Sequence, residues 1–108
     1  MGGQSYMASK SLFDRPRPTR VVTVLGHKLK IKVVPYLEDE CEELLGAFNS
    51  ELKTIYLVKS CNWKAVLLHE IIHAILHYSA TGEGLSLSKE ESIVLSLEHG
   101  LAPILKFD

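Results

Sequence analysis

Residues 62–78, NWKAVLLHEIIHAILHY, form the stretch of this chain that decides its fold. The stretch predicts a helix with apolar residues on nearly every side, and a helix of that kind is buried. Asn62 is a typical N-cap residue, and Gly82 and Gly84 follow the stretch, so the helix is expected to run from Asn62 to about Tyr78. We therefore expect this helix to lie in the core of the protein.

Two β-hairpins are predicted before this helix. Residues 21–34 form two β-like runs around a turn at Gly26, which is typical of a hairpin. In residues 29–34, apolar side chains alternate with lysines, so one face is expected to be buried and the other to be in water. Residues 46–58 predict the second hairpin. The acidic residues 36–45 between the hairpins predict a short helical turn or an irregular crossing.

A second helix is predicted after the first. Ser88 is a suitable cap residue, the helical pattern continues to about Leu101, and Pro103 then ends or kinks the helix. The order of hairpin, hairpin, helix and helix indicates an α+β fold. In this fold a small, mostly antiparallel sheet carries its helices on one face.

The chain of 108 residues is long enough for one domain and too short for barrels or doubly wound enzymes. Its net charge of −1 hides an asymmetry, because residues 1–35 carry seven Lys and Arg against Asp14, whereas residues 36–108 carry five against twelve acidic residues. We divide the chain into a flexible basic leader, residues 1–19, and a single domain, residues 20–108. The basic run in the leader is short, so it predicts a solvated arm rather than a nucleic-acid partner.

The sequence also indicates where the protein works. No apolar run approaches the roughly 20 residues that a membrane-spanning helix needs, and the first residues lack the apolar segment of a secretory signal. Cys41 and Cys61 are too few for a disulfide framework and are predicted to be reduced thiols. We therefore expect a cytoplasmic protein without a membrane partner.

Residues 69–73, HEIIH, carry the chemistry. His69 and His73 lie four residues apart, so a helix projects both imidazoles to one side, at a separation that suits two ligands of one zinc ion. Glu70 lies on the adjacent stripe, where it can take a proton from a zinc-bound water and return it to a leaving amine. Polar groups on a buried helix need partners, and metal binding provides them. The alternative, which we consider weaker, is that the three residues are ordinary polar residues on a half-exposed edge of the helix.

The second helix offers candidates for the third protein ligand that a catalytic zinc takes. Glu91 is favoured, because the small Ser92 and Ser96 beside it let this helix approach the first one closely. The alternative role of Glu91 is a capping box with Ser88. Glu90 lies on a stripe of apolar residues and is the weaker candidate, although it is not excluded.

Other polar residues are expected around the metal rather than on it. His77 lies about 80° around the helix from His69 and too far along it to complete the same tetrahedron, so it is expected at the rim or in support of the ligands. Glu98 and His99 of the second helix are expected to support or rim the site. Tyr78 follows the motif and is a candidate for stabilising an oxyanion, on proximity alone.

These residues resemble small zinc metallopeptidases of gluzincin type, and most closely ImmA/IrrE-like proteins and the short metallopeptidase-like proteins of phages and prophages. The resemblance rests on HEIIHAI at residues 69–75 and LSKEE at residues 87–91, and it spans residues 20–105. It implies a zincin-like minimal domain, with a small twisted sheet, an active-site helix and a glutamate helix. It further implies host cytoplasm for a phage-encoded chain, Glu70 as catalytic base, and zinc held by three ligands: His69, His73 and Glu91.

The sequence thus predicts a zinc-dependent hydrolase that cleaves a protein or peptide with metal-activated water. In such folds the substrate lies extended along an edge strand, and residues 52–58 are the expected strand unless they belong to the core. The alternative is a non-catalytic, zinc-stabilised interaction module of phage or prophage origin. The two hypotheses differ in whether any peptide is cleaved.

Overall fold

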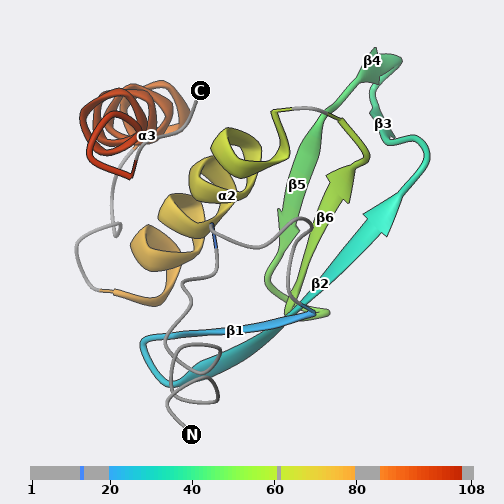
Figure 1. Cartoon of the computed structure of the whole chain (residues 1–108), viewed down its shortest axis with the longest axis horizontal. Helices are drawn as coiled ribbons and strands as arrows, with labels where there is room; N and C mark the ends of the chain where they lie inside the picture. Colours follow the sequence, from blue (N-terminus) through green and yellow to red (C-terminus); the bar gives the residue numbers. More distant parts are fainter. Residues whose placement is uncertain (1–12, 14–19, 61, 80–85, 106–108) are drawn as a thin grey trace, which may run out of the picture.

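Figure 1 shows the computed structural model of this chain, which describes residue 13 and residues 20–60, 62–79 and 86–105. A four-stranded sheet contains, in spatial order, β1 (Val21–Val24), β2 (His27–Val34), β6 (Thr54–Val58) and β5 (Gly46–Asn49). A separate two-stranded sheet contains β3 (Glu38–Asp39) and β4 (Glu42–Glu43). The helices are α2 (Trp63–Tyr78) and α3 (Leu87–Leu101). The fold is α+β with a mostly antiparallel sheet, as predicted.

Both predicted hairpins are present, and a parallel pairing joins them. β1 pairs antiparallel with β2 around a turn in which Gly26 has a φ of 84°, and β5 pairs antiparallel with β6. β2 and β6 run parallel, with Ile31 opposite Ile55. Because β6 has partners on both sides, the expectation that residues 52–58 form the edge strand for a substrate is wrong. The edge strand on this side of the sheet is β5.

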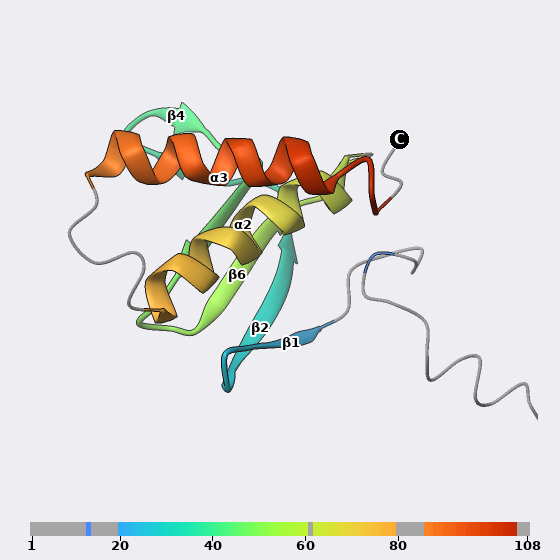
Figure 2. The same ribbon diagram turned by 90° about the vertical axis from the view of Figure 1, so that its left-hand side faces the viewer.

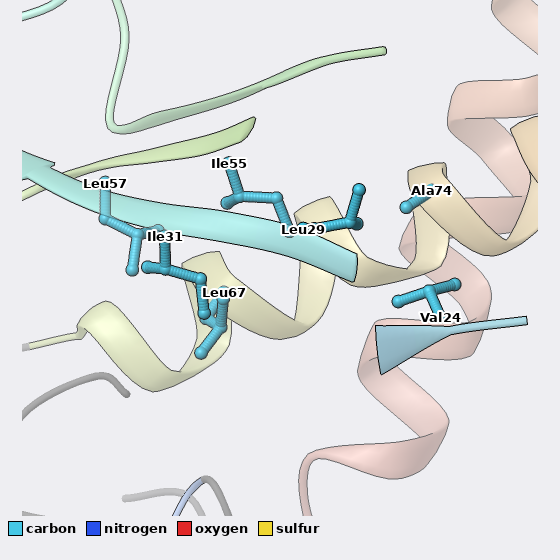
Figure 3. Packing of buried hydrophobic residues seen from close by; sticks show 7 residues of the cluster. All are labelled: Val24, Leu29, Ile31, Ile55, Leu57, Leu67 and Ala74. Atoms are coloured by element: carbon cyan, nitrogen blue, oxygen red, sulfur yellow. The ribbon is translucent and has the colours of Figure 1, made fainter. Parts of the chain in front are cut away.

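Helix α2 lies between the sheet and α3, as Figures 1 and 2 show from two directions. Toward the sheet, Leu67 and Ala74 of α2 join a buried cluster with residues of β1, β2 and β6 (Figure 3): Val24, Leu29, Ile31, Ile55 and Leu57. Toward α3, a second cluster contains Leu68, Ile72, Leu76 and Val94. Burial of each such Leu or Ile contributes about 1.5–3 kcal/mol. The prediction that this helix is buried is confirmed toward the sheet and toward α3, whereas Ile75 and His77 are exposed.

Phe13 packs against both clusters, although it belongs to the leader that was predicted to be flexible. An aromatic ring buries a large apolar area, so this contact attaches residue 13 to the domain. The rest of the predicted leader, residues 1–12 and 14–19, lies outside the described residues.

Residues 38–43 form a small hairpin and not the helical turn or irregular crossing expected for this region. Its two cross-strand pairs are Glu38 with Glu43 and Asp39 with Glu42. Glu40 and Cys41, between the strands, have positive φ angles of 50° and 66°. Two-residue hairpin turns of this geometry favour Asn and Gly, so these residues did not mark the turn. Cys41 is an exposed free thiol, which agrees with the prediction for it.

The N-terminus of α3 also differs from the expectation. The N-cap is Ser86, whose Oγ accepts a hydrogen bond from the N–H of Lys89 at 3.3 Å. Ser88 therefore lies inside the helix, and the capping box that was the alternative role of Glu91 does not form. Capping at Ser86 leaves the Glu91 side chain available for the contacts with α2 described below.

Helix α2 follows Asn62 and ends at Tyr78, as predicted. The Asn62 side chain does not cap the helix, because its Oδ1 accepts a hydrogen bond from Ser60 Oγ at 2.8 Å. Gly82, Gly84 and Cys61 lie outside the described residues. Within the part of the chain that the structure describes, neither helix has the length and apolar character needed to cross a membrane.

Gly46 lets β5 approach α2 closely, and this contact can be tested. A Cβ at this position would lie 2.6 Å from Cγ1 of Val66 and 3.3 Å from Cγ of Glu70. Gly46→Ala is therefore expected to lower the free energy of unfolding by about 1–3 kcal/mol, measured by urea denaturation. The control is Gly100→Ala on α3, where a Cβ meets nothing within 4 Å. This control should be neutral or stabilising by about 0.5–1 kcal/mol, and equal effects of the two substitutions would contradict the close contact.

Candidate metal centre

Helix α2 places His69 and His73 side by side. One helical turn separates the two residues, and the centroids of their rings lie 5.0 Å apart. Both imidazoles are reached by carboxylates of α3. The α2–α3 interface thus contains an apolar part, built around Val94, and a polar part, built around the two histidines.

Glu91 of α3 bridges the two histidines. Its Oε1 lies 2.9 Å from Nε2 of His69, and its Oε2 lies 3.3 Å from Nε2 of His73. One ligand atom from each of these three residues falls within 4.8 Å of the others, which is a spacing that can hold a metal ion. The Glu91 side chain is 45% exposed, so the cluster is open to water on one side.

The other nitrogen of each imidazole is held by a second carboxylate of α3. Nδ1 of His69 donates to Oε1 of Glu98 at 2.7 Å, and Nδ1 of His73 donates to Oε2 of Glu90 at 2.8 Å. A hydrogen bond of this kind fixes the tautomer and orientation of a metal-binding histidine and makes it a better ligand. When a ring is neutral, this hydrogen bond leaves the lone pair of its Nε2 directed at Glu91.

This arrangement identifies the kind of ligand that fits the cluster. A lone pair on Nε2 and a carboxylate oxygen repel each other at about 3 Å unless a proton or a cation lies between them. Two imidazole nitrogens and one carboxylate form the ligand set of many catalytic zinc sites, which keep a further position for water. The donor set of His69, His73 and Glu91 therefore fits zinc.

Glu70 lies on the neighbouring stripe of α2, close to β5 and Gly46. It is 8% exposed, and this burial raises the pKa of its carboxyl group above the usual value. Glu91 and Glu98 add to the increase, whereas His73 and His69 act against it. A buried carboxyl group with a raised pKa is suited to accept and return a proton near neutral pH.

His69 has a raised pKa as well. Its burial alone would lower the pKa, but the hydrogen bond to Glu98 and the charges of nearby carboxylates outweigh that effect. The raised pKa of His69 reflects the carboxylates crowded around it, whereas burial is the main cause of the raised pKa of Glu70 and the carboxylates add a smaller part. The site therefore favours additional positive charge.

The structure brings together the residues that the sequence analysis selected. His69, His73 and Glu91 form the cluster, and Glu70 lies beside them. Glu90, the weaker candidate for third ligand, contacts His73 through Nδ1 instead. The expected support from Glu98 is present in its contact with His69. Glu98 lies seven residues after Glu91, a spacing that returns to the same helix face, so this signal was available in the sequence.

Other expectations for this region are not met. Ser92 and Ser96 are exposed, so the helices approach through Val94 and not through small serine side chains. His99 is exposed, and no contact with His69 or His73 is found for it among the described residues.

The end of α2 forms an aromatic group outside the ligand cluster. His77 is exposed, and its ring meets Phe48 of β5 edge-on with the centroids 5.8 Å apart. Tyr78 stacks on His27 at 3.8 Å, and its buried hydroxyl has no hydrogen-bond partner among the described residues. Tyr78 therefore connects the end of α2 to the β1–β2 turn, which differs from the suggested role at an oxyanion.

Comparison with known proteins identifies no relative, because no family model, curated protein or solved structure matches this chain. The candidate site accordingly rests on its own geometry.

The supporting role of Glu98 and Glu90 can be measured through metal affinity. Glu98→Gln and Glu90→Gln should each weaken zinc binding by about 10–100-fold, because each removes the carboxylate that orients an imidazole. Competition with a coloured chelator gives the dissociation constants, and circular dichroism checks the fold. Glu51→Gln, an exposed change in the β5–β6 turn, is the control. Affinities equal to that of the control would show that these carboxylates do not orient the ligands.

Glu70 should make the stability of the metal-free protein depend on pH. A raised pKa means that the folded state binds this proton more tightly than the unfolded state, so the stabilisation is present at acidic pH and is lost as the pH rises through the folded-state pKa. Glu70→Gln remains neutral and should therefore be more stable than the parent protein at neutral pH, but not at acidic pH. Urea unfolding in the presence of chelator measures this, and a stability gain independent of pH would contradict it.

Proposed function

We propose that this chain is a small zinc-dependent metallopeptidase of gluzincin type. The observation that carries the proposal is the convergence of both Nε2 atoms on the two oxygens of Glu91, with both Nδ1 atoms held by separate carboxylates. Such convergence from two helices supplies three ligands and orients two of them. It supports a zincin-like minimal domain, the finer description that the resemblance implied.

The chain's own residues then have distinct tasks. His69, His73 and Glu91 bind the zinc, which when present lowers the pKa of a bound water to about 7 and polarises a carbonyl group. Glu70 holds the proton taken from that water and delivers it to the leaving amine. Burial of Glu70 raises its pKa, which favours the protonated form between the two transfers. Glu90 and Glu98 hold the imidazoles in place.

β5 is the strand along which a peptide substrate fits in this proposal. Val58 N–H donates to the carbonyl of Leu45, and in an antiparallel pair the direction of such bonds alternates along the strand. The backbone groups of Gly46 and Phe48 therefore point away from β6, toward the open edge. Gly46 also lies beside Glu70, so a peptide paired with β5 passes next to the proposed base.

A second function is favoured by one specific observation, the small apolar contact of α3. On this helix only Val94 is fully buried, half-buried Ile93 packs beside it, and three carboxylates make the polar contacts with α2. A metal held between the helices would therefore stabilise the position of α3 even without catalysis. This supports the alternative of a zinc-stabilised interaction module, which the following experiment distinguishes.

Glu70→Gln separates the two functions. In a peptidase, this variant should still bind one zinc per chain by elemental analysis, but it should cleave a mixed peptide library about 10²–10⁴-fold more slowly, because the proton acceptor is lost. His99→Ala is the control and should retain both properties. A zinc-bound Glu70→Gln variant that cleaves as fast as the parent protein would exclude Glu70 as the base. A zinc-bound parent protein that cleaves nothing and unfolds on chelation would favour the interaction module.

A further inference from the structure

The face of the sheet that points away from α2 carries a row of lysines. Lys28, Lys30 and Lys32 of β2 are all exposed, while the intervening Leu29 and Ile31 are buried against α2. β1, β2, β5 and β6 contain no Asp or Glu. We call the outward side of these strands the lysine face, and its formal charge in the strands is entirely positive.

The β3–β4 hairpin has the opposite charge. Its six residues, 38–43, include five carboxylates, and both cross-strand pairs join like charges. Like charges directly opposite each other destabilise a pair of strands. Figure 1 shows that this hairpin projects beyond the end of the four-stranded sheet, so its side chains are accessible. A positively charged surface placed against it would remove the repulsion.

The two surfaces do not neutralise each other within one molecule. Among the described residues, the ion pairs that the structure contains join histidines and glutamates of α2 and α3, and none joins the hairpin to the lysine face. Both surfaces are therefore open to an intermolecular contact. The net charge of −1 adds no strong general repulsion between copies.

Both surfaces also offer apolar area next to their charges. On the lysine face, half-buried Tyr56 lies opposite Lys32 on the neighbouring strand, and Val58 follows two residues later. Beside the hairpin, Tyr36 and Leu45 are exposed. Interfaces are strongest where aromatic and apolar groups lie within a surrounding polar zone, and this combination is present on both sides.

We propose that the lysine face is the docking surface for the β3–β4 hairpin of a second copy of this chain. The contact is head-to-tail, because it joins two different surfaces, and repetition of it leads to rings or filaments rather than a closed two-fold dimer. Its charge complementarity gives specificity and fast association more than high affinity. This association involves none of the residues of the candidate metal centre.

Charge reversal on each surface tests the proposal. Sedimentation velocity of the full chain should show association that depends on protein concentration and weakens at high salt. Lys30→Glu with Lys32→Glu should abolish it. Glu38→Lys with Glu42→Lys should abolish it as well, and this second variant places opposite charges across both hairpin pairs, so the hairpin should remain folded.

Mixing the two variants is the decisive step. The lysine-face variant alone carries two negative surfaces, and in the hairpin variant the hairpin charge falls from −5 to −1, so each variant alone should stay monomeric. An equimolar mixture again offers an unchanged lysine face to an unchanged hairpin and should associate at low salt. The control is Lys64→Glu with Lys89→Glu, which places the same change of net charge as the lysine-face variant on the two helices. This control should associate like the parent protein. Failure of the mixture to associate would overturn the proposal. So would a parent protein that remains monomeric but binds a labelled single-stranded oligonucleotide through Lys30 and Lys32, because the lysine face would then serve a polyanion.

Discussion

Two imidazoles that each need partners on both ring nitrogens impose the main constraint on this structure. His69 and His73 belong to a helix whose other residues are mostly apolar, and an unsatisfied polar group on such a helix is costly. α3 meets the need with three carboxylates, two at the Nδ1 atoms and one between the Nε2 atoms. The position of α3 therefore depends on the polar site as much as on the apolar contact at Val94.

The same helix determines how the sheet is arranged. α2 fills one face of the sheet with Leu67 and Ala74, so the inner strands β2 and β6 direct their apolar residues toward it. β5 reaches the helix only because Gly46 lacks a side chain, and this brings the open edge of the sheet next to Glu70. Sheet edge, buried carboxyl group and histidine pair are thus brought together by one central helix. A protein of this size needs no further layer to assemble them.

Much of this arrangement could be predicted from the sequence. The strong periodic signals, HEIIH on a long apolar helix and the alternating LKIKVV strand, correctly predicted α2, β2 and the placement of the two histidines side by side. The parallel pairing of β2 with β6 was not foreseen, because local sequence does not report which distant strands become neighbours. The hairpin turn at Glu40 and Cys41 was missed because neither residue favours a positive φ.

The α3 contacts show a second limit of sequence reasoning. Glu91 and Glu98 share one helix face, which was visible from their spacing, whereas Glu90 had been assigned to an apolar stripe. The division of the three carboxylates between Nδ1 and Nε2 depends on how the two helices approach each other. That approach is determined by Val94, a single buried residue, and not by the small serines that were expected to determine it. Side-chain roles within a cluster therefore follow from packing and not from spacing alone.

The distribution of charge links the site to the rest of the molecule. Four carboxylates surround the two imidazoles, and among the described residues no lysine or arginine forms an ion pair with any of them. The lysines of β2 alternate with Leu29 and Ile31, which are buried toward α2, so they lie on the opposite face of the sheet from the site. At physiological salt the screening length is about 8 Å, so their charge does little at the site. The carboxylates must therefore be balanced locally, by protons on His69 and Glu70 or by a bound cation. In the function proposed above, a divalent metal between both Nε2 atoms and Glu91 is the cation that satisfies the charge and the lone pairs together.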